Sequence, residues 1–394
     1  MVTKELKNNG IETISQIRIM HVLSDKDQRL PSLDNLISGL DRNVFSQVIC
    51  YLRGDDNKRT KLEVWGHEVI SLDTSKKKLR GFQPAVVFQL ARIIKEKGID
   101  IIHCQRHKPT VYGTLAAHMT GMNLKVISHV HGLGRTRSFR RKLLNRVLFR
   151  RISHIIAVSN AVREDIIRTN WMSPLDKVVT VYNGIDVKQY SDSSLTRKEA
   201  RIRLGLPDKE VFVYGTVGRL VETKGQEVLL KAFARVYEKY SESWLILVGD
   251  GRLESELRSL AAELNIDERV VFMGYRTDIP EVLKAYDVFV FPSIAEGMPL
   301  ALLEAMAAEL PVIASRVGGV LEILNTPELG TMVSAHSVDD LASAMEGLCR
   351  TSEEKRYEIG KALRERVLEE FSEEKMISAI TAEYLVVMNM TLES

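Results

Sequence analysis

Two glutamates, Glu296 and Glu304, stand with seven residues between them in the stretch FPSIAEGMPLALLE. The apolar run at 288–291 predicts a buried strand, which Pro292 ends because proline has no N–H to donate. Residues 300–309 are good helix formers. Glu296 is therefore expected in a loop at the carboxyl end of a strand, and Glu304 in the following helix, about a turn and a half from its start.

This arrangement suits a ligand that carries hydroxyls on both sides of a phosphate. Ligands of open α/β sheets bind at the carboxyl ends of the strands. The N-terminus of a helix at that place offers free N–H groups and a positive dipole end to an anion. One carboxylate on the loop and one on the helix can each hold a pair of hydroxyls, with the phosphate between them.

A second strand–loop–helix unit carries two cations five residues apart. The strand is expected at 211–217, the loop holds Gly218, Arg219 and Lys224, and the helix is expected at 226–240. The forked guanidinium and the ammonium point charge together suit a diphosphate. The alternative is a glycine-containing turn with solvated charges.

These motifs resemble the retaining glycosyltransferases of family 4, also called group 1, which have the two-lobed GT-B fold. E-x7-E and R-x4-K carry the resemblance, which covers 211–348 with several motifs in order; in the front half it rests on His131, Ser159-Asn160 and 183–186. It implies an α/β chain of two doubly wound Rossmann-like domains facing a cleft. The expected parts are an acceptor-side domain at 1–190, a nucleotide-sugar-binding domain at 191–372, and a helix at 373–394 that crosses back to the first domain.

The resemblance also implies a role for individual residues. Glu304 would bind the ribose hydroxyls and Glu296 the hydroxyls of the donor sugar. Arg219 and Lys224 would hold the departing diphosphate, and His131 would lie beside the donor sugar and help to stabilise the transition state. The implied donor-binding residues are Gly218, Arg219, Lys224, Tyr275, Arg276, Glu296, Gly297, Met298, Pro299, Leu300 and Glu304.

The histidines between positions 103 and 131 raise the question of a metal. They are His103, His107, His118, His129 and His131, and neither their spacing nor their neighbours fit a usual zinc pattern. We therefore expect no metal and no cofactor. His131 ends a strand expected at 125–130, and a structural strand-end histidine is the alternative to its catalytic role.

The first loop departs from the family pattern. Asp25-Lys26-Asp27 is a short DxD match to the metal–diphosphate motif of the other large glycosyltransferase fold, but solvated loop charges explain it better. The Gly-Gly pair that family members usually have there is replaced by 27–32, where Arg29 could substitute for the backbone contact to phosphate.

Charge is unevenly divided along the chain. Residues 1–190 carry 32 Lys and Arg against 17 Asp and Glu, whereas 191–394 carry 23 against 35, so the front half is expected to meet something anionic. Residues 135–151 predict a basic amphipathic helix with apolar residues at helical spacing. Three readings stay open: an anionic membrane surface, an ordinary core helix, and nucleic acid, which the lack of interleaved aromatics disfavours. The basic residues of this surface are Arg135, Arg137, Arg140, Arg141, Lys142, Arg146, Arg150 and Arg151.

Composition predicts a two-domain globular protein, because 394 residues exceed the ~250–300 that one core supports. The polar stretch 1–16 does not read as a signal peptide, and no apolar run approaches the ~18–20 residues of a membrane span. Three widely spaced cysteines suggest a reduced, cytoplasmic protein. The basic helix adds the expectation that the protein is peripheral on the inner face of the cytoplasmic membrane. Polar residues 190–196 read as an interdomain linker.

The function expected from the sequence is metal-independent, retaining transfer of a sugar from a nucleotide-sugar donor, taken to be a UDP-sugar. The expected acceptor is a cell-envelope glycan or glycolipid such as lipopolysaccharide core, and no nucleic acid takes part. The alternatives are a sugar-nucleotide epimerase or phosphorylase on the same fold, and a nucleotide-sugar-binding module without catalysis.

Overall fold

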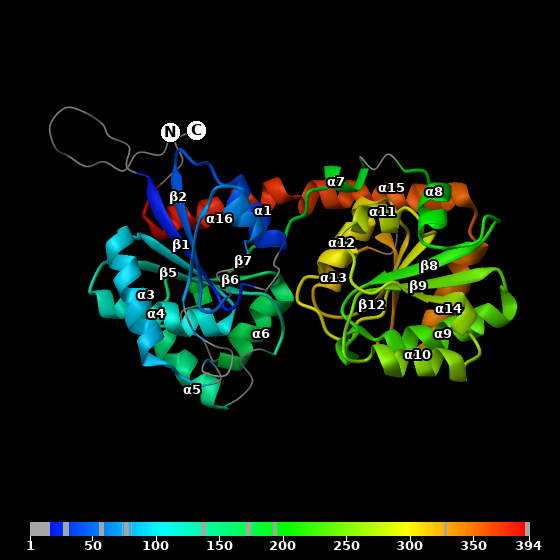
Figure 1. The fold of residues 1–394 in the computed structure, drawn as a ribbon, viewed down its shortest axis with the longest axis horizontal. Helices are drawn as coiled ribbons and strands as arrows, with labels where there is room; N and C mark the ends of the chain where they lie inside the picture. Colours follow the sequence, from blue (N-terminus) through cyan, green and yellow to red (C-terminus); the bar gives the residue numbers. More distant parts are fainter. Residues whose placement is uncertain are drawn as a thin grey trace. The chain divides into compact units, whose positions relative to one another are not determined.

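The structure is a computed structural model that describes residues 16–26, 31–54, 59–72, 74, 79, 81–134, 139–170, 175–191, 195–326 and 329–390. The chain forms two compact units (Figure 1). One comprises the chain up to Gly184 together with the part from Glu373 onward, and the other comprises Ile185–Ser372. Residues 185–190, expected in the first domain, thus belong to the second unit.

The first unit is built on a seven-stranded parallel sheet of order β3-β2-β1-β4-β5-β6-β7. Its strands are β1 (Ile17–Leu23), β2 (Phe45–Tyr51), β3 (Glu68–Ser71), β4 (Ile101–Gln105), β5 (Lys125–Val130), β6 (His154–Ala157) and β7 (Val178–Thr180). Its helices are α1 (Pro31–Gly39), α2 (Lys61–Val64), α3 (Pro84–Lys97), α4 (His107–Thr120), α5 (Phe139–Leu148), α6 (Asn160–Asn170), the 3₁₀ turn η2 (Leu175–Lys177) and α16 (Glu373–Val387).

The C-terminal helix α16 is part of the first unit. It packs against α1, and Met376, Ile380 and Tyr384 join the apolar core beneath the sheet. Two neighbouring residues bond to histidines of the sheet: Tyr384 Oη lies 2.7 Å from His103 Nδ1, and Glu383 Oε2 lies 2.6 Å from His154 Nδ1. Helix α16 thus completes the core of the domain that contains β1.

The second unit is built on a six-stranded parallel sheet of order β10-β9-β8-β11-β12-β13. Its strands are β8 (Phe212–Val217), β9 (Ser243–Val248), β10 (Val270–Phe272), β11 (Val288–Phe291), β12 (Val312–Ser315) and β13 (Thr331–Val333). Its helices are α7 (Lys188–Ser191), α8 (Arg197–Arg203), η3 (Glu222–Lys224), α9 (Gln226–Lys239), α10 (Glu254–Glu263), η4 (Asp267–Arg269), α11 (Ile279–Leu283), α12 (Leu300–Ala307), α13 (Val320–Ile323), α14 (Val338–Arg350) and α15 (Glu353–Glu370).

Both sheets are doubly wound, which confirms the expected fold class. Apolar residues of α9, α10 and α14 pack on one face of the second sheet, while α7, α11, α12 and α15 contact one another elsewhere in the unit (Figure 1). The strand order reverses between β1 and β4 in the first sheet and between β8 and β11 in the second. Such a switch point opens a crevice at the carboxyl ends of the strands, where ligands bind. The edge strands β7 and β13 have three residues each, which are too few to show a periodic pattern by themselves.

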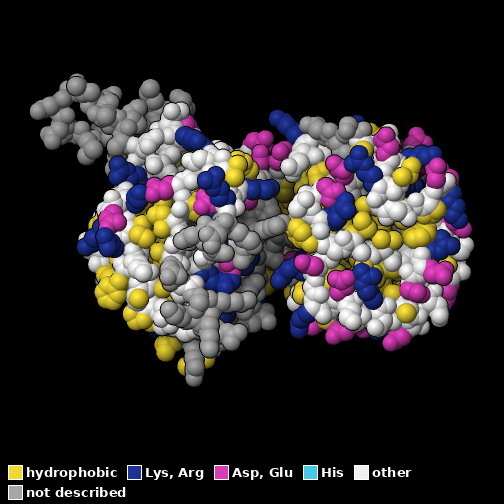
Figure 2. Space-filling model, in the orientation of Figure 1, with side chains coloured by type: hydrophobic (Ala, Val, Ile, Leu, Met, Phe, Trp, Pro, Cys, Tyr) yellow, Lys and Arg dark blue, Asp and Glu magenta, His cyan; other side chains and the backbone are white. Residues whose placement is uncertain are grey.

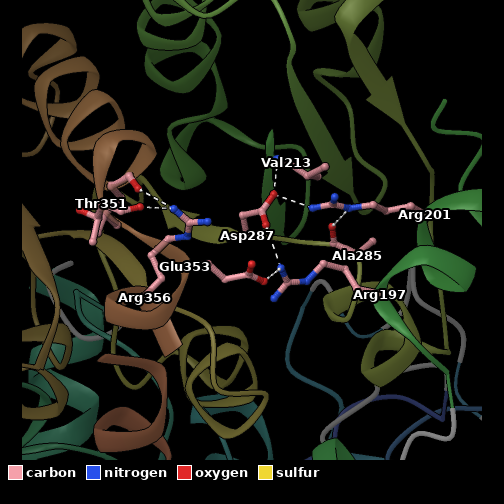
Figure 3. Close-up of polar contacts among 9 residues, drawn as sticks. Arg197, Arg201, Val213, Ala285, Asp287, Thr351, Glu353 and Arg356 are labelled. Atoms are coloured by element: carbon pink, nitrogen blue, oxygen red, sulfur yellow. Dashed lines mark hydrogen bonds and ion pairs between the residues drawn. The ribbon is translucent and has the colours of Figure 1, made fainter. Parts of the chain in front are cut away.

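The opposite, amino end of the second sheet is anchored by a buried carboxylate. Asp287, which directly precedes β11, has a side chain only 5% exposed. Its Oδ2 accepts hydrogen bonds from Arg201 Nη2 at 2.6 Å and from the Val213 backbone N at 2.7 Å (Figure 3). Its Oδ1 lies 3.4 Å from Arg197 Nη1. Burial raises the pKa of Asp287, and the guanidinium groups oppose that rise, so α8 is held to the sheet by a desolvated ion pair.

Replacing Asp287 by alanine is expected to destabilise the protein by about 3–5 kcal/mol, because removing one partner leaves a buried charge uncompensated. Urea unfolding followed by circular dichroism measures the loss. The control is Asp208→Ala, which breaks an exposed ion pair between Asp208 and Lys198, a residue of α8. This variant should change the unfolding midpoint little. Equal midpoints for the two variants would show that Asp287 is not an anchor.

Candidate functional site

Three loops at the carboxyl ends of β8, β11 and β12 pack backbone against backbone. Gly225 has φ +68°, and a Cβ there would lie 2.0 Å from the carbonyl oxygen of Pro292. A Cβ on Gly319 would lie 2.1 Å from the carbonyl oxygen of Gly297. The Ile294 N–H also donates to the Thr223 carbonyl at 2.8 Å. Glycine is therefore required at both positions, because a side chain would clash with the neighbouring backbone. The three loops are closely packed against one another at the switch point.

The two loops that flank the switch point bring a cation and a carboxylate together. Lys224, the last residue of η3, places its Nζ 2.6 Å from Glu296 Oε1 on the loop after β11. Both side chains are mostly buried, at 21% and 13% exposed, and Lys224 Nζ lies 5.3 Å from the centre of the Phe291 ring. Residues 72 positions apart, each predicted to contact the donor, thus meet at one place in the second unit.

Arg219 adds an exposed guanidinium to the same loop. It follows Gly218, and among the described residues its side chain forms no ion pair. The backbone around it is held in place, because Gln226 Nε2 donates to the Arg219 carbonyl at 2.9 Å. A Cβ on Gly249, after β9, would lie 2.0 Å from the Gly218 carbonyl oxygen, so the neighbouring loop supports this one. Arg219 is consequently a cation available to an anionic ligand.

Helix α12 begins beside Glu296 without a side-chain cap. Its N-cap residue is Pro299, Met298 is buried, and Leu300 opens the first turn. Helix N-termini leave backbone N–H groups without intrahelical partners. The segment from Gly297 to Leu300 therefore brings N–H donors and a positive dipole end to the same carboxyl edge of the sheet as Lys224.

Glu304 lies one turn further along α12 and is hydrogen-bonded by a residue that we had not predicted. The Tyr190 hydroxyl donates to the Glu304 carboxylate. Burial raises the pKa of Glu304 to about 7, and this hydrogen bond opposes the rise. The expectation that 190–196 forms a polar linker is wrong at its first residue, because Tyr190 is a buried part of α7, which packs on α11 and α12. The contact between Tyr190 and Glu304 could not be predicted, because no local sequence pattern around Tyr190 indicates it.

Tyr275 and Arg276 follow β10 at the same edge of the sheet. Tyr275 is 51% exposed and so is accessible to a ligand. Arg276 is engaged, because its Nε donates to Asp278 Oδ1 at 2.8 Å and its Nη2 pairs with Asp278 Oδ2. Arg276, the predicted donor-binding cation outside the R-x4-K loop, thus has a partner that a ligand would have to replace.

His131 is carried by the first unit, directly after β5. Its Nε2 lies 2.7 Å from Gln105 Oε1, and its ring stacks on that of His129 at 4.5 Å between centroids. Gln105 ends β4, next to the switch point of the first sheet. The sequence offered no signal for Gln105, because only the pairing of β4 with β5 brings it beside the histidine.

Helix α5 exposes its apolar residues. Phe139, Leu143 and Val147 are 78%, 61% and 56% exposed, whereas Leu148 is buried. The interpretation that the apolar face of this helix joins the core is therefore wrong for most of its apolar residues. Arg146 and Arg150 are exposed as well. Hydrophobic side chains reach the surface near this end of the first unit (Figure 2). The remaining basic residues fall in three groups: Arg141, Lys142 and Arg151 are described, the Arg140 side chain is not, and Arg135 and Arg137 lie outside the described residues.

Nothing in the described part of the chain resembles a metal site or a membrane span. No group of three or more His, Cys, Asp or Glu there could hold a metal ion. Asp25 of the DxD match pairs with Arg53, while Asp27 and Arg29 lie outside the described residues. No described helix combines the length and the apolar composition needed to cross a bilayer.

Comparison with known proteins gives consistent matches over both units. Residues 196–366 match the family model of glycosyl transferases group 1, and residues 32–189 match that of glycosyltransferase family 4. The chain is 28% identical over 309 residues to the UDP-Gal:alpha-D-GlcNAc-diphosphoundecaprenol alpha-1,3-galactosyltransferase of Escherichia coli, covering 76% of this chain and 78% of that protein.

Two further similarities extend this result. The chain is 30% identical over 278 residues to the GDP-mannose-dependent monoacylated alpha-(1-6)-phosphatidylinositol monomannoside mannosyltransferase of Corynebacterium glutamicum, covering 66% of this chain and 70% of that one. The crystal structure of Anabaena Alr3699/HepE with UDP and glucose superposes with a TM-score of 0.81 at 22% identity, covering 94% of this chain and 99% of that one. At that identity the similarity concerns the fold.

Proposed function

The chain belongs to the glycosyltransferases of group 1 and family 4, and from this membership we propose that it moves a sugar from a UDP-sugar to a lipid-linked glycan of the cell envelope, with retention of configuration and without a metal ion. Use of a nucleotide-sugar donor follows from the family itself. The base, the acceptor, the stereochemistry and the metal independence are parts of the proposal.

The observation that carries the proposal is the convergence of Lys224 and Glu296 at the switch point of the second sheet. Beside this ion pair stand the exposed Arg219 and the uncapped start of α12. Three sources of positive charge therefore lie on the loops after β8 and β11, at the edge where an α/β sheet binds its ligand. Such a set fits a diphosphate joined to a sugar.

Donor binding would exchange the internal ion pair for contacts to the ligand. The diphosphate would take over Lys224, assisted by Arg219 and by the N–H groups at the start of α12. The freed Glu296 carboxylate would accept hydrogen bonds from the hydroxyls of the donor sugar. Glu304, held by Tyr190, would accept from the ribose hydroxyls. Because the phosphate charge increases as the bond breaks, cations already in place stabilise the transition state more than the ground state.

The proposed bond changes need no protein nucleophile. The bond from the anomeric carbon to the diphosphate oxygen breaks while the acceptor hydroxyl oxygen bonds to the same face of that carbon. The hydroxyl proton passes to the leaving phosphate. Glu296 pairs with Lys224 and Glu304 accepts a hydrogen bond from Tyr190, and the proposal assigns neither of them the nucleophile role known from retaining hydrolases. The part of His131 in this step is a prediction taken from the family.

A thermal-shift screen against UDP-, GDP- and ADP-sugars tests the donor. A ligand that binds only the folded state raises the melting temperature with its concentration. We expect UDP-sugars to raise it, and Glu304→Ala to abolish the shift because the ribose contact is lost. If only GDP- or ADP-sugars raise the melting temperature, the donor base proposed here is wrong. If no donor raises it, the site is refuted.

Chelation tests the absence of a metal. Turnover in excess EDTA is expected to equal turnover in buffer, because Lys224, Arg219 and the helix N-terminus supply the charge that a metal provides in other transferases. The measurement is release of the nucleoside diphosphate with and without EDTA, with a Mg²⁺ add-back as control. Loss of turnover in EDTA and recovery on add-back would show that a metal takes part.

The acceptor proposal rests on α5 and on two relatives named for lipid-linked acceptors. Exposed apolar residues beside exposed arginines are typical of a helix that lies in an anionic lipid interface. The enzyme would then reach its acceptor, such as a lipopolysaccharide-core precursor, on the inner face of the cytoplasmic membrane. On the second unit, Lys and Arg side chains are interspersed with Asp and Glu in the view shown (Figure 2).

Vesicle flotation tests this surface. The protein is expected to float with vesicles that contain anionic lipid and to stay down with neutral vesicles, because each basic residue near the surface contributes about 1 kcal/mol. Reversing the charge of Arg146 and Arg150 should reduce flotation. Reversal of two exposed lysines of the second unit, Lys231 and Lys239, serves as the control. Equal flotation on both vesicles, or none on either, would contradict membrane docking.

A further inference from the structure

A row of aromatic rings crosses one face of the first sheet and ends at His131. The rings of His103 and His129 are stacked at 5.3 Å between centroids, and those of His129 and His131 at 4.5 Å. His21 of β1 lies 5.4 Å from His103, its register partner on β4. These side chains share one face because they sit at alternate or paired positions of neighbouring strands. All but His131 are buried.

Hydrogen bonds link His131 back through this row to the C-terminal helix. His131 Nε2 lies 2.7 Å from Gln105 Oε1, and Gln105 Nε2 lies 3.3 Å from His103 Nε2. His103 Nδ1 lies 2.7 Å from the Tyr384 hydroxyl on α16. The chain of contacts therefore runs from Tyr384 through His103 and Gln105 to His131, with a defined atom at every step.

The chemistry of the amide gives this chain a direction. A glutamine oxygen only accepts and its nitrogen only donates. His131 must then carry a proton on Nε2 to donate to Gln105 Oε1, and His103 Nε2 must be bare to accept from Gln105 Nε2. The His103 proton consequently sits on Nδ1 and is donated to the Tyr384 oxygen. The Nε2 atom of His131 is thereby assigned as protonated, and in His103 the Nδ1 atom is protonated and Nε2 is bare.

Burial keeps the inner part of the row neutral, as this assignment requires. Desolvation lowers the pKa of His103 well below its usual range, with a smaller contribution from the other rings of the row, and lowers that of His129 to about 3. A neutral His103 has one bare nitrogen to accept from Gln105, whereas an imidazolium would have none.

We propose that Gln105 is a positioning residue that keeps a proton on His131 Nε2 and fixes the orientation of the His131 ring. A fixed orientation of this ring then matters for the sugar transfer in which His131 takes part under the proposed function. Tyr384 and His103 orient the Gln105 amide from the other side, and the C-terminal helix thereby supports a reacting group. Only this consequence for the reaction rests on the proposed function, whereas the proton on His131 Nε2 does not depend on it.

Side-chain ¹⁵N NMR of the full-length protein, labelled at histidine, tests the assignment without reference to activity. The wild type is expected to show His131 protonated on Nε2, and His103 protonated on Nδ1 and bare on Nε2. Gln105→Leu should move the two His131 nitrogen signals toward averaged values. The reverse tautomers in the wild type, or unchanged His131 signals in Gln105→Leu, would overturn the proposal.

Gln47→Leu is the matched control. Gln47 on β2 contacts the buried ring of His21 at 3.2 Å and donates to the Ile37 carbonyl at 2.9 Å, so its loss removes a similar glutamine–histidine contact from the same sheet. It is not linked to Gln105 in the chain described above. The His131 signals should stay unchanged in this variant, and a shift as large as in Gln105→Leu would overturn the specific role of Gln105.

Kinetic measurements test whether the orientation of His131 by Gln105 matters for the reaction, which the NMR spectra do not show. Gln105→Leu is expected to lower kcat about tenfold with an unchanged KM for the donor, less than the ~10²–10⁴-fold typical of losing a proton-transfer group itself. That result, with the NMR change, supports both statements. Unchanged kcat together with the NMR change would sustain the positioning by Gln105 and overturn the part of His131 in the reaction.

Discussion

Replacing Lys224 by alanine is expected to lower kcat by about 10²–10³-fold, the usual result of removing one preorganised group that stabilises developing charge. The ammonium is mostly buried and already aimed at the switch point, so neither water nor Arg219 can take its place at low cost. Single-turnover release of the nucleoside diphosphate measures the effect. The melting temperature of the variant shows whether it remains folded.

The matched control for this variant lies in the next helix. Lys231 forms an ion pair with Glu227 at 2.6 Å, the same distance as in the pair of Lys224 and Glu296, but on the exposed surface of α9. Lys231→Ala should leave turnover unchanged. Near-normal turnover in Lys224→Ala would refute the site, while arginine in place of Lys224 should restore part of the activity by retaining the charge.

Replacing Glu296 by alanine is expected to lower turnover by about two orders of magnitude or more, because a bound sugar would lose the carboxylate that orients it. Glu296→Gln keeps the size and removes the charge, so it should recover only a fraction of the loss. Thermal-shift titration with the donor shows whether binding or the chemical step is impaired. Glu227→Ala, which opens the exposed pair, is the control.

The double variant distinguishes a catalytic pair from a structural one. If Lys224 and Glu296 act on different parts of the donor, as we propose, the two losses should combine to nearly the sum of their activation free energies. If they serve only each other, the second substitution should add nothing to the first. The second outcome would contradict the proposed exchange of the ion pair for ligand contacts.

The alternation of strands and helices could be predicted from the sequence because it depends on local composition. Apolar β-rich runs such as 288–291 are followed at once by Pro292 and a helix-forming stretch, and the structure has β11 and α12 there. The placement of Glu296 on a loop and Glu304 on a helix depends on the same short stretch. The family motifs lie within such stretches, so donor chemistry could be predicted with the fold.

Tertiary structure alone decided which residues of different stretches meet. Lys224 contacts Glu296 because β8 and β11 are neighbours in the sheet, although β9 and β10 stand between them in the chain. Tyr190 reaches Glu304 only through the packing of α7 on α12, and Gln105 reaches His131 only through the pairing of β4 with β5. The exposed face of α5 could not be foreseen either, because its apolar spacing suits a core and a lipid surface equally. Local sequence determines the dihedral preferences and burial tendency of a segment, whereas the order of strands and the packing of helices depend on the free energy of the whole domain.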